Sequence, residues 1–190
     1  MPVDKRIRTL SDIVRRLRQG ESFSVTRLTS IKSLCRDQRA ASEFSLHLGQ
    51  LCLRKMKGRC PRHLTPSKHK LFRELAESAV SHMEAYNKRR SERTKRPLVS
   101  LLSKIERAQD QYERHAWGAV RVIESQNLLA IENALSAILY PLRSSNACYK
   151  IARCYVERYE ARHGTGLVPS SAEPLQEIVD FWSTYLDKRA

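Results

Sequence analysis

Four residues with metal-binding side chains stand close together in the sequence. They are Cys52, Cys60, His63 and His69. Thiolates and neutral imidazoles are good zinc ligands, and the Cys60-x-x-His63 pair could hold one ion between its two side chains. However, Cys52 falls on an apolar helical stripe, and the spacing matches no common zinc module. The pattern favours a buried thiol followed by a basic loop, with a zinc site left open as an alternative.

Other patterns that could support catalysis have simpler explanations. Ser67 and Lys70 match the Ser-x-x-Lys of some nucleophilic enzymes, but no partner motif accompanies them, and Ser67 is expected to cap a helix. The glycines of "HGTG", residues 163–166, follow no strand, so a phosphate-binding loop is not indicated. Acidic residues between 67 and 114 fall at helical spacing from lysines and arginines, as on a solvated helix face. The sequence therefore predicts no enzyme and no cofactor.

The strongest chemical signal is positive charge. The chain has 190 residues and a formal net charge of +15 at pH 7. Residues 1–96 contain 24 Lys and Arg and 9 Asp and Glu, whereas residues 97–190 contain 11 of each kind. An excess confined to one half of a chain suggests contact with a polyanion such as nucleic acid. Arginine predominates in the basic groups, and its guanidinium forms forked contacts with phosphate.

The basic residues form groups, the densest of which lies in "NKRRSERTKRP", residues 87–97. The side chains predicted to bind nucleic acid are Lys88, Arg89, Arg90, Arg93, Lys95, Arg96, Arg15, Arg16, Arg18, Arg36, Arg39, Arg54, Lys55, Lys57, Arg59 and Arg62. Several groups fall beside expected helix ends or in loops, so they could share a face. Aromatic residues are sparse among them, which argues against base stacking on a single strand. The sequence predicts backbone binding without sequence specificity, to DNA or to RNA.

Apolar residues recur at three- and four-residue steps along nearly the whole chain. This periodicity predicts an all-α fold, a bundle of about six helices. One helix is expected to close at Gly20. Another is expected to begin at Ser67, to bury a stripe that includes Leu71, and to stop before Pro97 with the basic stretch at its end.

The second half of the chain continues the helical pattern. Residues 98–140 form one long helix or two, with Gly118 the weakest point, and Pro141 ends them. Two further helices follow. The second contains Trp182, whose helical spacing favours a place in the core.

Several classes of protein are excluded by composition. The charged opening lacks the apolar stretch of a signal peptide, and no apolar run reaches the roughly 18 residues of a membrane span. Five cysteines at irregular spacing argue against a disulfide framework, so most are expected to be small core residues. The sequence therefore predicts a soluble, cytoplasmic protein without a membrane partner.

The two halves are expected to have different roles within one compact domain. Residues 1–96 form a basic helical half that faces nucleic acid. Residues 97–190 form a neutral helical half for packing and for docking other protein subunits. Exposed Trp117 or Tyr149 could anchor such a partner.

A small, all-helical, strongly basic chain without catalytic motifs resembles the small subunits of CRISPR effector complexes of the Cascade type. The resemblance is one of character over the whole chain, carried by the helical stripes and the segments "KRRSERTKR" and "LRKMKGR". It implies several copies of the chain beside other subunits of a ribonucleoprotein, with arginine and lysine guiding the target or displaced strand of the R-loop. The guide RNA would then read the sequence.

Two functions of other classes remain as alternatives. The basic face could dock an acidic protein, which would make the chain a helical adaptor or regulator. The loop with Cys60, His63 and His69 could instead belong to a metalloenzyme.

Overall fold

The structure, a computed structural model, describes residues 4–21, 28–56, 65–113, 123–163 and 172–189. These residues form α-helices and short 3₁₀ turns, with no strand among them. The elements are α1 (Lys5–Arg18), α2 (Ser30–Leu34), α3 (Gln38–Met56), α4 (Pro66–Lys88), α5 (Glu92–Glu113), α6 (Ile123–Leu139), η2 (Pro141–Arg143), α7 (Ser144–His163) and α8 (Ala172–Asp187). The predicted all-α bundle is confirmed.

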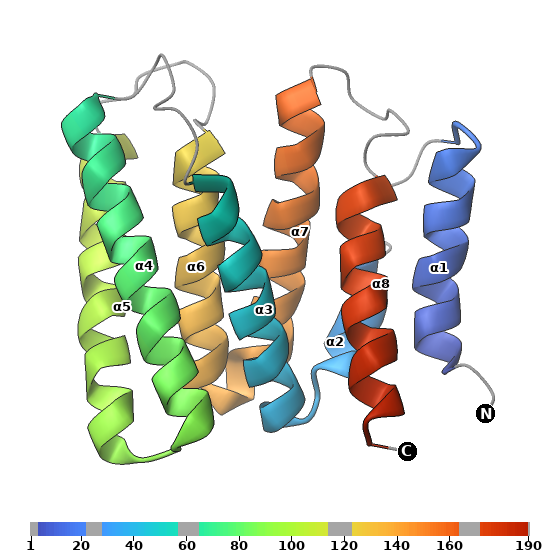
Figure 1. Ribbon diagram of the computed structural model, residues 1–190, viewed down its shortest axis with the longest axis horizontal. Coiled ribbons are helices and arrows are strands. Elements are labelled where there is room, and N and C mark those ends of the chain that lie inside the picture. The colour runs from blue at the N-terminus through green and yellow to red at the C-terminus, as the bar shows by residue number, and fades with distance from the viewer. Residues whose placement is uncertain (1–3, 22–27, 57–64, 114–122, 164–171, 190) are drawn as a thin grey trace.

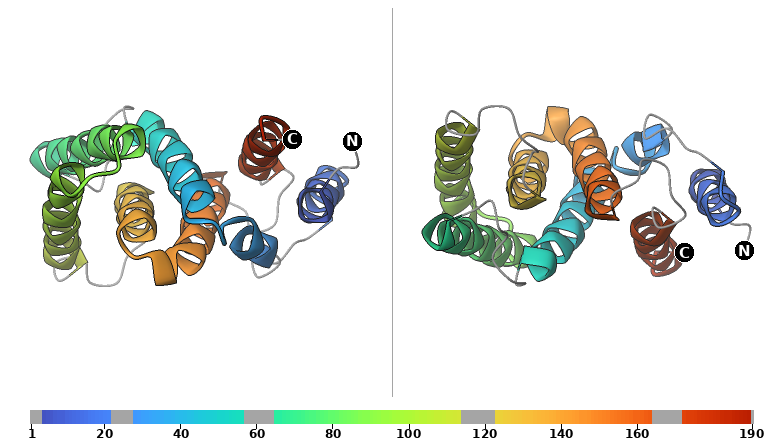
Figure 2. Two further views of the ribbon diagram at one scale, coloured as in Figure 1. Left: turned by 90° about the horizontal axis from the view of Figure 1, so that it is seen from below. Right: turned by 90° about the horizontal axis from the view of Figure 1, so that it is seen from above.

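The helices stand side by side in an elongated bundle (Figure 1). Viewed along the helices, α3, α6 and α7 occupy the middle, α4 and α5 lie at one end, and α1, α2 and α8 lie at the other (Figure 2). Helices from the basic half and from the neutral half therefore alternate in space. Among the described helices, none is both long and apolar enough to cross a membrane.

The central helix α6 is apolar on almost every side. Its buried apolar side chains are Leu128, Ala130, Ile131, Ala134, Leu135, Ala137, Ile138 and Leu139, and the polar Asn127 is buried with them. A helix that is apolar all round must be covered by its neighbours, and here α3, α5 and α7 cover it. Pro141 follows its last turn, as the sequence predicts.

Helix α1 begins at a side-chain cap. Asp4 accepts a hydrogen bond from the Arg6 backbone N–H at 2.8 Å and binds the Arg6 guanidinium at 2.6 Å. The hydrogen bond from the Arg6 side chain lowers the pKa of Asp4 from 3.8 to about 2. Arg6 also donates to the carbonyl of Ser33 at 3.1 Å, which ties the start of α1 to α2. The helix closes before Gly20, whose φ of 82° is the left-handed geometry that glycine favours.

Two predictions about α4, its N-cap and the burial of Leu71, are wrong. Its cap is Thr65, which accepts from the Lys68 N–H at 3.4 Å, with Pro66 in the first turn, whereas Ser67 lies inside the helix. Leu71 is 44% exposed, because Phe72 and its helical neighbours Ala76, Ala79 and Met83 form the buried face instead.

The cysteines that the structure describes are mostly core residues. Cys35, Cys52 and Cys148 are buried, and Cys154 is half-buried. Burial raises the pKa of the Cys35 thiol, and the Cys148 thiol beside it raises that pKa further. The Cys35 thiol therefore stays protonated, and the buried cysteines act as small apolar side chains.

Candidate nucleic-acid interface

The segment Lys88–Arg96, which we call the α4–α5 corner, joins two long helices by a tight turn. Helix α4 ends at Lys88, and α5 begins at Glu92. Ser91 and Thr94 cap the new helix reciprocally, since each backbone N–H donates to the hydroxyl of the other, at 3.2 and 3.3 Å. The Thr94 hydroxyl also bonds the Arg89 carbonyl at 2.6 Å. The turn is therefore closed by its own side chains.

This geometry corrects the predicted end of the fourth helix. The basic stretch was expected to finish that helix, with Pro97 as the stop. Instead the chain turns at residues 89–91, and Pro97 lies inside α5. Pro97 is the sixth residue of α5, past the first turn, so it cannot supply the N–H that would normally bond the Arg93 carbonyl. The side-chain caps at Ser91 and Thr94 set the boundary.

Polar contacts with α3 hold the end of α4 in place. Asn87 donates from its amide to the carbonyl of Ser42 at 3.2 Å and accepts from the Ser42 hydroxyl. One turn earlier, Gln50 donates to Glu84 at 2.8 Å. Because these contacts come just before the corner, the basic side chains project from a supported turn.

The cations of the corner are largely uncommitted. Lys95 pairs with Glu92 at 3.4 Å. The other basic side chains are exposed and have no ion pair with any residue that the structure describes; these are Lys88, Arg89, Arg90, Arg93 and Arg96. Like charges held this close repel one another, so an anionic partner would stabilise the arrangement.

Other helix ends bring further cations to the same edge of the bundle, the lower edge in Figure 1. Gln38, at the start of α3, donates to the carbonyl of Ala137, near the end of α6, at 3.2 Å. Arg189, after α8, pairs with Asp37 at 3.7 Å. We call this surface the basic edge. Besides the corner, its exposed cations are Lys5, Arg8, Arg36, Arg39, Arg143, Lys188 and Arg189. Its acids are Asp4, Asp37, Glu43, Glu92 and Asp187.

The remaining predicted cations that the structure describes lie toward the opposite edge, where α1 and α3 end (Figure 1). Most of them already have partners there. Arg15 pairs with Asp12 at 3.3 Å, and Arg16 pairs with Glu21 at 2.5 Å. Arg18 donates to Gln176 at 3.2 Å. The structure therefore divides the predicted set between two edges.

Lys55 and Arg54 are neighbours on α3 but differ in their polar contacts. Lys55 donates to the Tyr155 hydroxyl at 2.6 Å and lies 4.0 Å from the Glu177 carboxylate. Arg54 is exposed and has no ion pair with a described residue. Lys57, Arg59 and Arg62 lie outside the described residues, and the structure does not test their predicted role.

Sequence reasoning missed the contributions of the second half. Arg143, Lys188 and Arg189 come from a segment with no net charge, so composition gave no reason to single them out. Only the direction of each helix brings them to the basic edge. The signal available in the sequence was their position at predicted helix ends.

The zinc alternative rests partly on residues outside the described part, since Cys60 and His63 fall in the segment 57–64. Cys52 and His69 are both buried, on α3 and α4. Within the described part of the chain, no cluster of three or more potential metal ligands occurs.

Comparisons with protein-family models, with curated proteins and with solved structures found no match to this chain.

Proposed function

We propose that this chain is a non-catalytic subunit that binds nucleic acid along the basic edge. It would hold the sugar–phosphate backbone without reading the base sequence. The observation that carries the proposal is the α4–α5 corner, where exposed arginines stand together without ion-pair partners among the described residues. Phosphate groups laid against them would neutralise the repulsion and release counterions, which favours binding.

The type of side chain supports a phosphate ligand. Arg89, Arg90, Arg93 and Arg96 each present a planar guanidinium that can donate two hydrogen bonds to one phosphate. Such contacts fix the position of a strand but carry no sequence information. The corner exposes no aromatic ring that could stack on a base, so backbone contact is the function that its chemistry favours.

Affinity measured against salt concentration tests the proposal. We expect the logarithm of the association constant for duplex DNA to fall linearly with the logarithm of salt concentration, with a slope of about −0.9 for each neutralised phosphate. Replacing Arg89, Arg90, Arg93 and Arg96 with glutamine should weaken binding equally for all sequences and reduce the slope by about one per lost contact. The same titration with duplex RNA shows which nucleic acid is preferred.

A second variant controls for most of the change in net charge, since it removes three positive charges where the corner variant removes four. Arg15, Arg16 and Arg18 form a second arginine group, already paired and located toward the opposite edge. Their replacement by glutamine should change the affinity and slope much less. A slope near zero for the unaltered protein, or equal losses in both variants, would contradict binding at the corner.

On the resemblance described above, we further propose that the nucleic acid is the target or displaced strand of an R-loop, held by a small subunit of a Cascade-type CRISPR effector complex. Purification of the tagged chain from its natural host checks this assignment. Co-purifying effector subunits and a guide RNA are the expected result. An acidic protein that remains bound after nuclease digestion, and is lost with the corner variant, would favour the adaptor function instead.

A further inference from the structure

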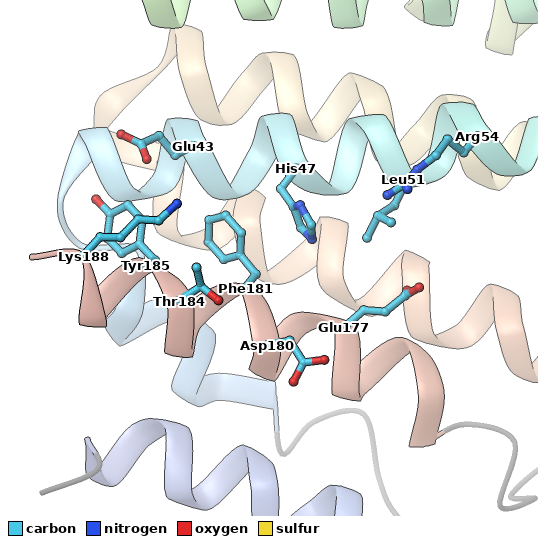
Figure 3. A pocket seen from close by; sticks show the side chains of 10 residues that line it. All are labelled: Glu43, His47, Leu51, Arg54, Glu177, Asp180, Phe181, Thr184, Tyr185 and Lys188. Atoms are coloured by element: carbon cyan, nitrogen blue, oxygen red, sulfur yellow. The ribbon is translucent and has the colours of Figure 1, made fainter. Parts of the chain in front are cut away.

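A groove lies between α3 and α8, away from the α4–α5 corner. Its volume is about 460 Å³, within the range of small-molecule sites. Figure 3 shows its lining side chains, which come from α3, α8 and the residue after α8. Three aromatic rings, those of Tyr185, Phe181 and His47, follow one another along it.

The three rings form a nearly parallel row. The ring of Phe181 lies 4.8 Å from that of His47, at an interplanar angle of 28°, and 5.8 Å from that of Tyr185, at 19°. Phe44 and Trp182 pack against Phe181 at 5.4 and 5.2 Å and fix its position from the core. Phe181 and His47 are only partly buried and offer aromatic surface to the groove. Tyr185 is 8% exposed, and the Arg189 guanidinium lies 4.7 Å from the centre of its ring.

The charged groups of the groove differ in how far they are already engaged. Glu43 binds Arg39 at 3.0 Å, and Asp180 accepts from Gln176 at 2.7 Å. Glu177 accepts from the Tyr155 hydroxyl.

The two cations that line the groove, Arg54 and Lys188, are exposed and have no ion pair with a described residue. They stand toward opposite ends of the aromatic row (Figure 3). The uncommitted chemistry of the groove is therefore an aromatic surface with a cation toward each end.

From this combination we infer that the groove binds a nucleotide, with its base on the exposed parts of the Phe181 and His47 rings and its phosphate on Arg54, the cation at the His47 end of the row. Stacking on aromatic rings and a charge-assisted contact to phosphate are the two interactions that an unpaired nucleotide makes with proteins. Of the carboxylates, Asp180 lies near the middle of the groove, Glu43 toward the end with Lys188 and Glu177 toward the end with Arg54 (Figure 3). The choice of a nucleotide among aromatic anions rests on the proposed nucleic-acid function. Its source is either an unpaired residue of a bound strand or a free mononucleotide.

Calorimetric titration with AMP, adenosine and inorganic phosphate tests the inference on the full chain. We expect AMP to bind more tightly than adenosine, and phosphate alone to bind more weakly still. Arg54→Gln and Phe181→Leu should each weaken AMP binding about tenfold, the first by losing the phosphate contact and the second by losing the stacking ring. Arg107→Gln removes an exposed arginine from α5, outside the groove, and should leave AMP binding unchanged.

The same variants identify the source of the nucleotide. A single-stranded oligonucleotide that loses affinity with Arg54→Gln and with Phe181→Leu, when AMP binds only weakly, identifies a strand residue. Tight AMP binding that the variants abolish identifies a free nucleotide. If neither AMP nor the oligonucleotide responds to either variant, or if phosphate alone binds as well as AMP, the inference is wrong.

Duplex DNA separates this inference from the proposed function, because its bases are stacked and paired. Phe181→Leu should leave duplex binding unchanged, whereas the corner variant should weaken it. Loss of duplex binding with AMP binding retained would overturn the backbone function alone. Intact duplex binding without any response in the groove would overturn the nucleotide site alone.

Discussion

Two arginines of equal formal charge can differ in what they offer to phosphate. Arg16 already holds Glu21 at 2.5 Å, so a phosphate would have to displace that carboxylate. Arg90 and Arg93 are exposed and hold no carboxylate of the described chain. An exposed ion pair is worth only about 0–1 kcal/mol, but several together reduce the gain from a new anionic contact. A count of basic residues therefore overstates the surface available to a strand.

The effect of burial on the pKa, and through it on stability, can be tested at a single residue, His47. Burial lowers the pKa of its imidazole below 6.5, and Arg54 lowers it further, while Glu177 opposes the change. Because the unfolded chain keeps the ordinary pKa, it binds more protons than the folded chain as the pH falls below 6.5. The contribution of His47 to stability is thus complete at higher pH and is lost as the pH falls toward the lowered pKa. We expect the unfolding temperature to fall less on acidification in His47→Gln than in the unaltered protein.

Thermal unfolding followed by circular dichroism at neutral and mildly acidic pH measures this difference. The other histidines are common to both proteins, so the comparison isolates His47. Identical pH dependence in the two proteins would exclude a neutral, buried His47.

At the scale of the element, the helices themselves could be predicted and their ends could not. Stripes such as Leu28, Ile31 and Leu34 are buried as their spacing predicts, because burial of one face is encoded every three to four residues. Boundaries depend on individual caps that compete locally. Pro97 looked like the stronger signal, yet the hydroxyls of Ser91 and Thr94 set the start of α5.

Gly49 on α3 marks a close approach between α3 and α4. A Cβ atom there would lie 3.0 Å from the terminal methyl of Met83 and 3.7 Å from Val80. Met83 can yield slightly, and alanine favours the helix, so Gly49→Ala should keep the free energy of unfolding within about 1 kcal/mol of the original. Gly49→Val carries two further methyl groups into the contact and should lower the free energy of unfolding by about 1–3 kcal/mol. Urea denaturation measures both values, and equal stability of the two variants would contradict the close packing.

At the scale of the whole molecule, the two predicted halves are interleaved. The charge imbalance between residues 1–96 and 97–190 predicts a basic surface but not its outline. Lys188 and Arg189 reach the basic edge because α8 runs toward it, and Arg16 points elsewhere because α1 runs away from it. The groove between α3 and α8 could not be predicted from the sequence either, since Phe181 and Arg54 are far apart in the chain. Such juxtapositions depend on helix direction, which periodicity does not record.

Trp182 connects the end of the bundle that holds α1 and α8 to α3 in its middle. Its fully buried ring packs 5.1 Å from Phe44 on α3 and 5.5 Å from Tyr185, and α8 in turn packs against α1. Trp182→Ala should lower the free energy of unfolding by about 3–5 kcal/mol, because it leaves a large cavity between α3 and α8. Trp182→Phe should cost less, since it keeps most of the aromatic volume. Chemical denaturation followed by near-ultraviolet circular dichroism gives both values; a negligible cost for alanine would mean that α8 contributes little to the common core.

Because the arginines of the α4–α5 corner have no ion pair with a described residue, dissolved salt should affect the free protein and its nucleic-acid complex in opposite directions. Dissolved anions gather around the corner and screen the repulsion between its guanidinium groups, which stabilises the fold of the free protein. The same ions compete for phosphate and loosen a bound strand. Moderate ionic strength should therefore raise the melting temperature of the isolated chain while it lowers that of the nucleoprotein relative to dilute buffer.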